Sequence, residues 1–376
     1  MTDRASPAAA PAAPDAAPGR QRPDPTPAYA ALDLGTNNCR LLLATPTGGP
    51  EGFRVLDGFS RIVRLGEGLA ATGALSEAAT ERALDALRAC AARLHRRPVR
   101  AARAVATEAC RRATNGRAFL ARAEAALGMP IGVITAREEA SLAMESCAPL
   151  LNPADRRALL FDIGGGSTEV AWIRAPRALG DAPELIGTVS VPVGVVTLSE
   201  RESSCATRAG FEAVAAEVAA RLEAFESVHR IRQEIRAGGV RLMGTSGTVT
   251  TLAGVVLDLP RYSRPLVDGR VLDAAEADAA LDALFALGRE GLAAHPCIGP
   301  ERADFVLPGC AVYAAIRRTW PTDRLTVCDR GLREGILLRL MRADRAGHGA
   351  PHHHGWHGGS GYAHHHRAAA AAAPPH

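Results

Sequence analysis

Apolar and polar positions along residues 28–343 alternate in a way that predicts strands and helices in turn. The helical period is clearest over 75–97, where Leu84, Leu87, Ala91 and Leu94 recur at three- and four-residue intervals behind Ser76, a suitable N-cap. Similar patterns predict a strand over 99–107, a helix over 115–127, a strand over 131–134, a helix over 137–147, a strand over 188–193 and an alanine-rich helix over 206–226. This alternation predicts an α/β fold.

Two segments share one order of strand, glycine turn and strand. The first is Ala31-Leu-Asp-Leu-Gly-Thr-Asn37 followed by Cys39-Arg-Leu-Leu-Leu-Ala44, and the second is Leu160-Phe-Asp-Ile-Gly-Gly-Gly-Ser-Thr-Glu169 followed by Val170-Ala-Trp-Ile173. Glycines permit a tight turn and leave backbone N–H groups uncovered, which creates a concavity for phosphate oxygens. A single glycine hairpin is more often plain structure, but two copies predict a duplicated fold that clamps a phosphate chain between its halves.

The carboxylates at the two strand ends, Asp33 and Asp162, are candidate ligands for Mg²⁺, often through water, with capping of the turn as the alternative. A third turn lies in the strand-turn-helix pattern of 241–254, where Gly247 and Thr248 begin the predicted helix. Helix N-termini attract phosphate through exposed N–H groups and the macrodipole, although such a turn can also be only a capped connection.

Composition restricts the chemistry further. A chain of 376 residues with 47% hydrophobic content is long enough for about two domains, and its net charge of +4 is scattered, which does not favour a nucleic-acid partner. All 44 basic side chains are arginines, so a P-loop lysine or a Schiff-base lysine is excluded. Phosphate must therefore be bound by arginine, metal or backbone N–H groups, and the planar fork of arginine suits that task.

The eight cysteines form no CxxC pair and sit among apolar residues, which indicates buried thiols in a reducing cytoplasm. We find no signal-peptide pattern and no apolar stretch long enough for a membrane span. Residues 1–27 and 344–376 have the composition of disordered tails. The histidine triplets at 352–354 and 364–366 lack a scaffold that would fix metal-ligand geometry, so we favour a tail over a metal site there.

Taken together, these motifs resemble the exopolyphosphatase and guanosine pentaphosphate phosphohydrolase family, within the actin, Hsp70 and sugar-kinase superfamily. The resemblance covers residues 28–343 and rests on Asp33-Leu-Gly-Thr-Asn-Asn38, Arg64-Leu-Gly-Glu-Gly-Leu69, Ala106-Thr-Glu-Ala-Cys-Arg-Arg-Ala-Thr-Asn-Gly116, Glu138-Glu-Ala140, the 162–169 and 244–254 turns, Glu301-Arg302, Pro308-Gly309 and Asp329-Arg-Gly-Leu-Arg-Glu-Gly-Ile336. The order of these pieces along the chain makes the match specific.

The resemblance implies two duplicated ribonuclease-H-like domains, 28–135 and 136–330, that flank a cleft, with a final helix over 331–343 packing back on the first domain. It implies Mg²⁺-dependent removal of the terminal phosphate of inorganic polyphosphate, or of the 5′ γ-phosphate of guanosine pentaphosphate. A homodimer is among its implications, and the chain looks like a short, two-domain member.

The resemblance also assigns roles to residues. Glu139 matches the catalytic glutamate and would accept a proton from water, although a glutamate at a helix start is otherwise ordinary. Glu169 matches a second acidic position near the chemistry, where it would help to position metal or water, or simply face solvent on a strand. Arg111 matches a basic position that would pair with phosphate, although an isolated arginine is otherwise usually a solvated surface residue. Where the family usually has Ser-Gly before this helix, the chain has Thr135-Ala136. The expected phosphate contacts are Gly35, Thr36, Asn37, Arg111, Gly164, Gly165, Gly166, Ser167, Thr168, Gly247 and Thr248.

Two other functions stay open from the sequence. An ATP-dependent small-molecule kinase shares the same clamp, and a non-catalytic sensor of the alarmone or of polyphosphate would signal by domain closure. Arginines 93, 96, 97, 100 and 103 can form a basic groove for a long polyanion, or simply a solvated helix face.

Overall fold

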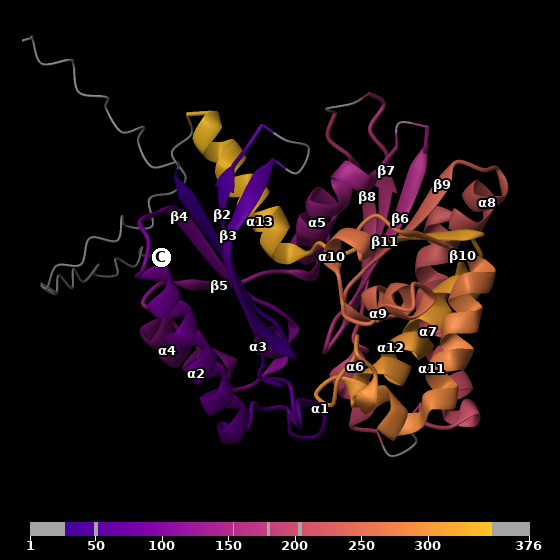
Figure 1. Cartoon of the computed structure of the whole chain (residues 1–376), viewed down its shortest axis with the longest axis horizontal. Helices are drawn as coiled ribbons and strands as arrows, with labels where there is room; N and C mark the ends of the chain where they lie inside the picture. Colours follow the sequence, from indigo (N-terminus) through magenta and orange to yellow (C-terminus); the bar gives the residue numbers. More distant parts are fainter. Residues whose placement is uncertain (1–26, 49–51, 153, 179–180, 202–204, 348–376) are drawn as a thin grey trace, which may run out of the picture.

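The computed structural model describes residues 27–48, 52–152, 154–178, 181–201 and 205–347. It has two mixed sheets side by side, each carrying helices (Figure 1). The first sheet has the order β3-β2-β1-β4-β5, formed by β1 (Ala28–Leu34), β2 (Asn38–Pro46), β3 (Phe53–Ile62), β4 (Val99–Ala106) and β5 (Ile131–Val133). Its helices are α1 (Leu69–Thr72), α2 (Glu77–Leu94), α3 (Glu108–Arg112) and α4 (Gly116–Leu127).

The second sheet has the order β10-β11-β9-β6-β7-β8. Its strands are β6 (Arg157–Ile163), β7 (Thr168–Arg174), β8 (Glu184–Val191), β9 (Val240–Thr245), β10 (Val271–Asp273) and β11 (Arg324–Cys328). The helices of this half are α5 (Ala136–Cys147), η1 (Ala148–Leu150), α6 (Val195–Ser199), α7 (Arg208–His229), α8 (Ile231–Arg236), α9 (Gly247–Val256), α10 (Arg264–Val267), α11 (Ala274–Ala294) and α12 (Ala303–Thr319). The chain then returns to the first half as α13 (Leu332–Arg345).

The same strand pattern begins both halves, which confirms the expected duplicated α/β fold of ribonuclease-H-like type. In each, three strands form an antiparallel meander, and a later strand pairs in parallel with the first of them: β4 with β1, and β9 with β6. The aspartates occupy equivalent places, because Asp33 lies opposite Arg40 across the β1–β2 hairpin and Asp162 lies opposite Glu169 across β6–β7.

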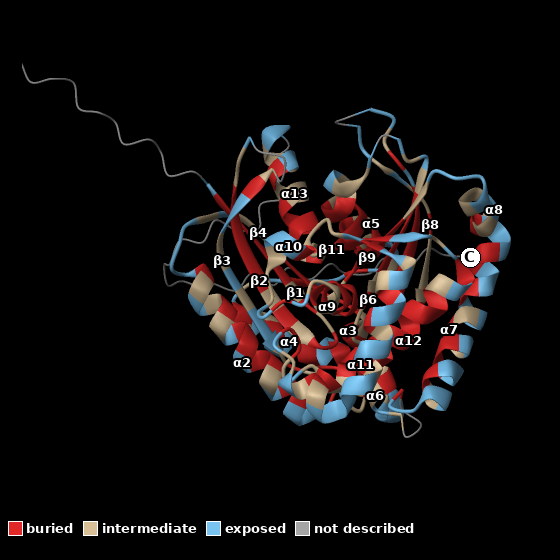
Figure 2. Ribbon diagram, turned by 45° about the vertical axis from the view of Figure 1, so that its right-hand side comes forward, coloured by how far each residue is buried: buried red, intermediate tan, exposed pale blue. Residues whose placement is uncertain are grey.

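Apolar residues on both faces of each sheet build the core. One cluster joins α2 and α4 to the first sheet, and a larger one joins α7, α9, α11 and α12 to the second. Figure 2 shows buried residues along the strands and exposed ones along the outer sides of α7 and α11. All eight cysteines are buried and free, as the sequence predicts. No helix in the described ranges is both long enough and apolar enough to cross a bilayer.

The helices α5 and α13 connect the two halves (Figure 1). They cross so closely that a Cβ on Gly335 would lie 2.2 Å from the carbonyl oxygen of Leu142. Leu142 packs with α13 on the first sheet, while Ala143 of the same helix packs on the second. Arg339 fixes the crossing by donating to Glu145 at 2.7 Å. Because α5 contacts both sheets, the division into domains at residue 135 stays a prediction.

Several element ends differ from the sequence prediction. Helix α2 ends at Leu94 and not at residue 97, since Pro98 follows and disfavours helical backbone before it. Helix α13 continues through Asp344, beyond the predicted start of the tail, because Asp344 accepts hydrogen bonds from Tyr29 (2.7 Å) and Arg100. The strand β3 and the helices α11 and α12 were not predicted. Most of the two predicted tails, including both histidine triplets, lies outside the described residues.

Candidate active site

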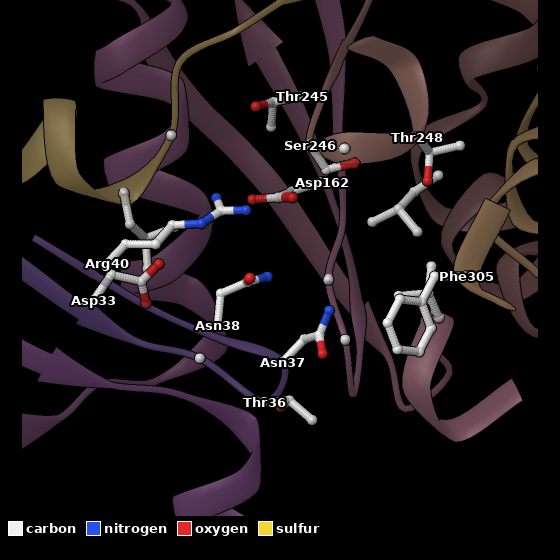
Figure 3. Close-up of a pocket in the computed structure, with 18 of the residues that line it drawn as sticks. Asp33, Thr36, Asn37, Asn38, Arg40, Asp162, Thr245, Ser246, Thr248 and Phe305 are labelled. Carbon is white, nitrogen blue, oxygen red and sulfur yellow. The ribbon is translucent and has the colours of Figure 1, made fainter. Parts of the chain in front are cut away.

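A cavity of about 670 Å³ lies between the two sheets (Figure 3). Its wall combines the two glycine turns, the N-terminus of α9, the start of α12 and the connection from β11 to α13. The predicted site residues that line it are Asp33, Gly35, Thr36, Asn37, Glu139, Asp162, Gly164, Gly165, Gly166, Ser167, Gly247 and Thr248. The structure therefore brings together residues that are up to 215 positions apart in sequence.

The two glycine turns have the same backbone hydrogen bond and pack against each other. The amide of Gly35 donates to the carbonyl of Asn38 at 2.9 Å, and Gly164 donates to Ser167 at the same distance. A Cβ on Gly166 would lie 2.7 Å from Oγ1 of Thr36, so this close approach of the turns requires glycine. Within the described residues, the backbone N–H groups of Thr36, Asn37, Gly165 and Gly166 donate to no acceptor, which leaves donors for an anion.

The third turn presents the N-terminus of α9 to the cavity. Ser246 precedes this helix with a φ of 99°, a strained conformation for a residue other than glycine. Its Oγ is buried without a hydrogen-bond partner. Next to it, Arg302 donates to the carbonyl of Gly247 at 2.9 Å, which brings a guanidinium beside the positive end of the helix. An unpartnered hydroxyl, a guanidinium and a helix N-terminus together suit a phosphate group.

Asp33 and Asp162 lie deep in the cavity, one from each sheet (Figure 3). Burial raises the pKa of both carboxyls, that of Asp162 to about 7. Among the described residues the buried Oδ1 atom of Asp33 has no hydrogen-bond partner, although the charges of Arg40 and Arg333 act to lower the pKa of this carboxyl. In the part of the chain that the structure describes, no three His, Cys, Asp or Glu side chains form a complete metal site. Two carboxylates still fit Mg²⁺, which commonly keeps waters and takes its other ligands from substrate phosphates.

Glu139, on the first turn of α5, is only 8% exposed and reaches the cavity wall. Its Oε2 accepts from Nη1 of Arg111 at 3.0 Å. Burial, with the nearby charges of Glu169 and Asp162, raises the pKa of Glu139 well above its usual range, against the opposing effect of Arg111. A carboxyl with a raised pKa is suited to general acid–base chemistry near neutral pH.

Arg111 is not among the residues that line the cavity, so its contact with phosphate stays a prediction. It donates to Glu108 at 2.9 Å and to the carbonyl of Ile134 at 2.7 Å, besides its bond to Glu139. These partners occupy the guanidinium of Arg111, which holds one oxygen of the Glu139 carboxylate, Oε2. Arg111 is therefore placed to orient Glu139.

Thr168 and Glu169 also lie behind the wall. The hydroxyl of Thr168 donates to the carbonyl of Val193 at 2.8 Å, which leaves no proton for a phosphate in this structure. Glu169 is 3% exposed, and its Oε1 accepts from Ser167 at 2.7 Å and from Ser190 at 2.8 Å. Burial raises the pKa of Glu169 while the two serines lower it. Glu169 therefore acts on the cavity by its negative charge, which raises the pKa of Glu139.

The Thr135-Ala136 departure leaves the turn before α5 intact. Oγ1 of Thr135 accepts from the amide of Glu138 at 3.2 Å, so threonine caps the helix that carries Glu139.

The wall contains five arginines that were not predicted as site residues: Arg40, Arg61, Arg302, Arg330 and Arg333. Burial lowers the pKa of Arg302 and of Arg333, as expected for cations held away from water. Figure 3 shows the guanidinium of Arg40 extending toward the carboxylate of Asp162. The absence of lysine was the available signal that arginine must bind phosphate. Arg302 and Arg333 stand in family motifs, but nothing in the sequence distinguishes Arg40 from a surface arginine.

Comparison with known proteins gives one family. A model of the Ppx/GppA phosphatase family matches residues 48–344. A solved structure of the Aquifex aeolicus member of that family is 26% identical, with 85% of this chain and 99% of that chain covered and a TM-score of 0.67. An exopolyphosphatase-like protein is 28% identical, with 83% and 97% covered and a TM-score of 0.73. An exopolyphosphatase from Cytophaga hutchinsonii, 22% identical over 84% and 98% of the two chains with a TM-score of 0.71, shares the fold.

Proposed function

Because the chain belongs to the Ppx/GppA phosphatase family, we propose that this phosphohydrolase releases the terminal phosphate of inorganic polyphosphate, the 5′ γ-phosphate of guanosine pentaphosphate, or both, with the help of Mg²⁺. One observation carries the proposal: a buried glutamate, oriented by an arginine, shares a cavity with two glycine turns that have free N–H groups. The cavity thus combines a general base with an anion site.

Glu139 takes the proton from the attacking water. In this role its Oε1 faces the water, while Oε2 is held by Arg111 at 3.0 Å. The raised pKa of Glu139 strengthens it as a base and also sets the pH below which it is protonated and inactive.

The wall neutralises the charge of the phosphate chain. The N–H groups of Thr36, Asn37, Gly165 and Gly166 bind its oxygens, and guanidinium groups face it from both halves. In phosphoryl transfer most of the catalytic effect comes from such positioning and charge stabilisation, because little covalent work falls to the protein.

Asp33 and Asp162 are the residues that would hold Mg²⁺, and the unpartnered Oδ1 of Asp33 supports this assignment. When bound, the ion supplies positive charge to the phosphate oxygens. The site needs both carboxylates ionised, and the pKa of about 7 for Asp162 makes that ionisation sensitive to pH near neutrality. The buried free thiols suit a reducing compartment, so we expect a cytoplasmic enzyme.

The experiment is Mg²⁺-dependent release of phosphate from long-chain polyphosphate, guanosine pentaphosphate and ATP, by the wild type and by Glu139→Gln. We expect release from at least one of the first two substrates and a loss of about a hundredfold or more in the variant, as removal of a general base predicts. Binding of both substrates without release would replace the hydrolase by a sensor. Transfer of phosphate only to an added acceptor would indicate a kinase.

A further inference from the structure

Arg61 stands at the rim of the cavity and has no ionic partner in the described ranges of the chain. It lies near the end of β3, an edge strand of the first sheet, and is both exposed and part of the cavity wall. Among the described residues, no carboxylate lies within 4.0 Å of its guanidinium. Most described arginines outside the cavity form ion pairs. Arg61 differs from them, so its charge is available to a ligand at the opening.

An aromatic ring holds Arg61 beside a second arginine. The guanidinium of Arg61 lies 5.3 Å from the centroid of the Phe59 ring, and that of Arg93, from the last turn of α2, lies 5.4 Å from the same centroid. Arg93 also pairs with Asp57 at 3.1 Å. A guanidinium over a ring keeps its N–H edges free for hydrogen bonds, and the stacking restricts its freedom before any ligand binds.

The basic surface continues past the end of α2. Arg96 and Arg97 follow Arg93 in the chain, are exposed, and have no carboxylate partner in the described part of the protein. In contrast, Arg100 pairs with Asp344 at 2.7 Å and Arg103 with Glu138 at 2.5 Å. Arg93 is paired as well, through its Nη1 with Asp57, so Arg96 and Arg97 are the members of the predicted run that have no carboxylate partner among the described residues.

We propose that Arg61, Arg93, Arg96 and Arg97 form an arginine track that holds the portion of a long inorganic polyphosphate chain outside the cavity. This inference rests on the proposed function and names its preferred substrate. The track begins at the rim, at Arg61, and runs over the edge of the first sheet. A chain whose end is bound between the glycine turns has further anionic units to place there, whereas a compact nucleotide does not. Exposed contacts of this kind add affinity for long chains and weaken with salt.

The test compares KM for long-chain polyphosphate with KM for tripolyphosphate in Arg61→Ala. We expect the ratio of the KM for the long chain to the KM for tripolyphosphate to rise about three- to tenfold, the size of one exposed charge contact. Arg54→Ala is the matched control, because Arg54 is exposed on the same strand, has no carboxylate partner among the described residues and does not line the cavity. The long-chain KM of Arg61→Ala should also depend less on salt than that of the wild type.

A second variant, Phe59→Leu, keeps both charges but removes the ring that orders them, and should raise the long-chain KM by a smaller factor. Equal changes for long and short substrates would place Arg61 against the terminal phosphates and overturn the track. The same holds if Arg61→Ala has no effect or matches Arg54→Ala. If the wild type releases phosphate from neither polyphosphate, the proposed function itself fails, which is a separate result.

Discussion

The β1–β2 and β6–β7 hairpins at the cavity have similar backbones, but they carry side chains of opposite charge next to their aspartates. Each begins with an aspartate at a strand end and has an amide-to-carbonyl bond of 2.9 Å across its turn. The residue opposite the aspartate differs: it is Arg40 in the first copy and Glu169 in the second. Directly opposite residues on neighbouring antiparallel strands project to the same face, so both lie beside their aspartate.

Arg40 and Glu169 differ in their surroundings as well as in their charge. Arg40 lines the cavity and has no carboxylate at ion-pair distance among the described residues, so its charge is available to phosphate. Glu169 is buried behind the wall, where Ser167 and Ser190 hold it and its charge raises the pKa of Glu139. The two hairpins thus have similar backbones, and the residue opposite the aspartate is a cation that lines the cavity in one copy and a buried carboxylate that raises the pKa of Glu139 in the other.

The largest expected effect comes from giving the first hairpin the charge of the second. Arg40→Glu should lower kcat/KM by about a hundredfold or more, since it removes a phosphate-binding cation and adds a repelling anion. Steady-state phosphate release measures this, with Arg54→Glu as a surface control and Arg40→Gln as the milder variant. A loss below about tenfold, the size expected for one exposed contact, would contradict a place for Arg40 in the phosphate site.

Neutralising the second hairpin should change the pH dependence instead. Without the charge of Glu169, Glu139 loses a cause of its raised pKa, so in Glu169→Gln the acidic limb of the pH–rate profile moves to lower pH. We expect kcat to fall by about tenfold, because the base weakens with its pKa. The profile of kcat/KM between pH 5 and 9 is the measurement. An acidic limb that stays in place would show that Glu169 does not act on Glu139.

The aspartates provide a test of the metal assignment. Burial raises the pKa of Asp162 to about 7, so the carboxyl takes up a proton below that pH and loses its capacity as a ligand. We expect the affinity for Mg²⁺, measured by calorimetry, to be nearly constant above pH 7 and to fall by about tenfold per pH unit below it. Asp162→Asn should abolish the binding. An affinity that is equal at pH 6 and pH 8 would contradict the two-carboxylate site.

The smallest expected effect is on stability without metal. The folded-state pKa of Asp162, about 7, lies above its ordinary value of 3.8, so the folded protein binds more protons between these values. Stability should therefore fall as the pH rises from 4 to 7 and level off above. The Asp162→Asn variant has no carboxyl to ionise at this position, so it is not destabilised in this way as the pH rises. Its melting temperature should exceed that of the wild type at pH 8 by on the order of 5 °C. The difference should shrink toward pH 5, and an equal difference at both pH values would refute its origin in this carboxyl.

Much of the fold could be predicted from the sequence, because the patterns that mark strands, turns and helix caps lie within short stretches of the chain. The repeated strand-turn-strand order predicted the duplication, and Ser76 marked the start of α2, where its hydroxyl accepts from Ala79 at 3.2 Å. The edge strand β3 gave no clear pattern, since its exposed and buried positions do not alternate regularly.

The residues of the candidate site could be predicted only where their position depends on neighbours in the sequence. The glycine turns, Asp33 and Asp162 line the cavity as their positions at strand ends suggested. The role of Arg111 depended on Glu139, 28 residues away, and on the carbonyl of Ile134, neither of which a sequence pattern reveals. Arg40 was missed for a similar reason: only the sheet register sets it beside Asp33.

The most direct test of the account is a single turnover on polyphosphate in ¹⁸O-labelled water, with wild type and Glu139→Gln side by side. If Glu139 directs water at the terminal phosphorus, the released orthophosphate carries one labelled oxygen and the remaining chain carries none. The variant should give the same product about a hundredfold more slowly. Label in the new end of the chain, or an equal rate in the variant, would contradict the assignment of Glu139 as the base that aims the water.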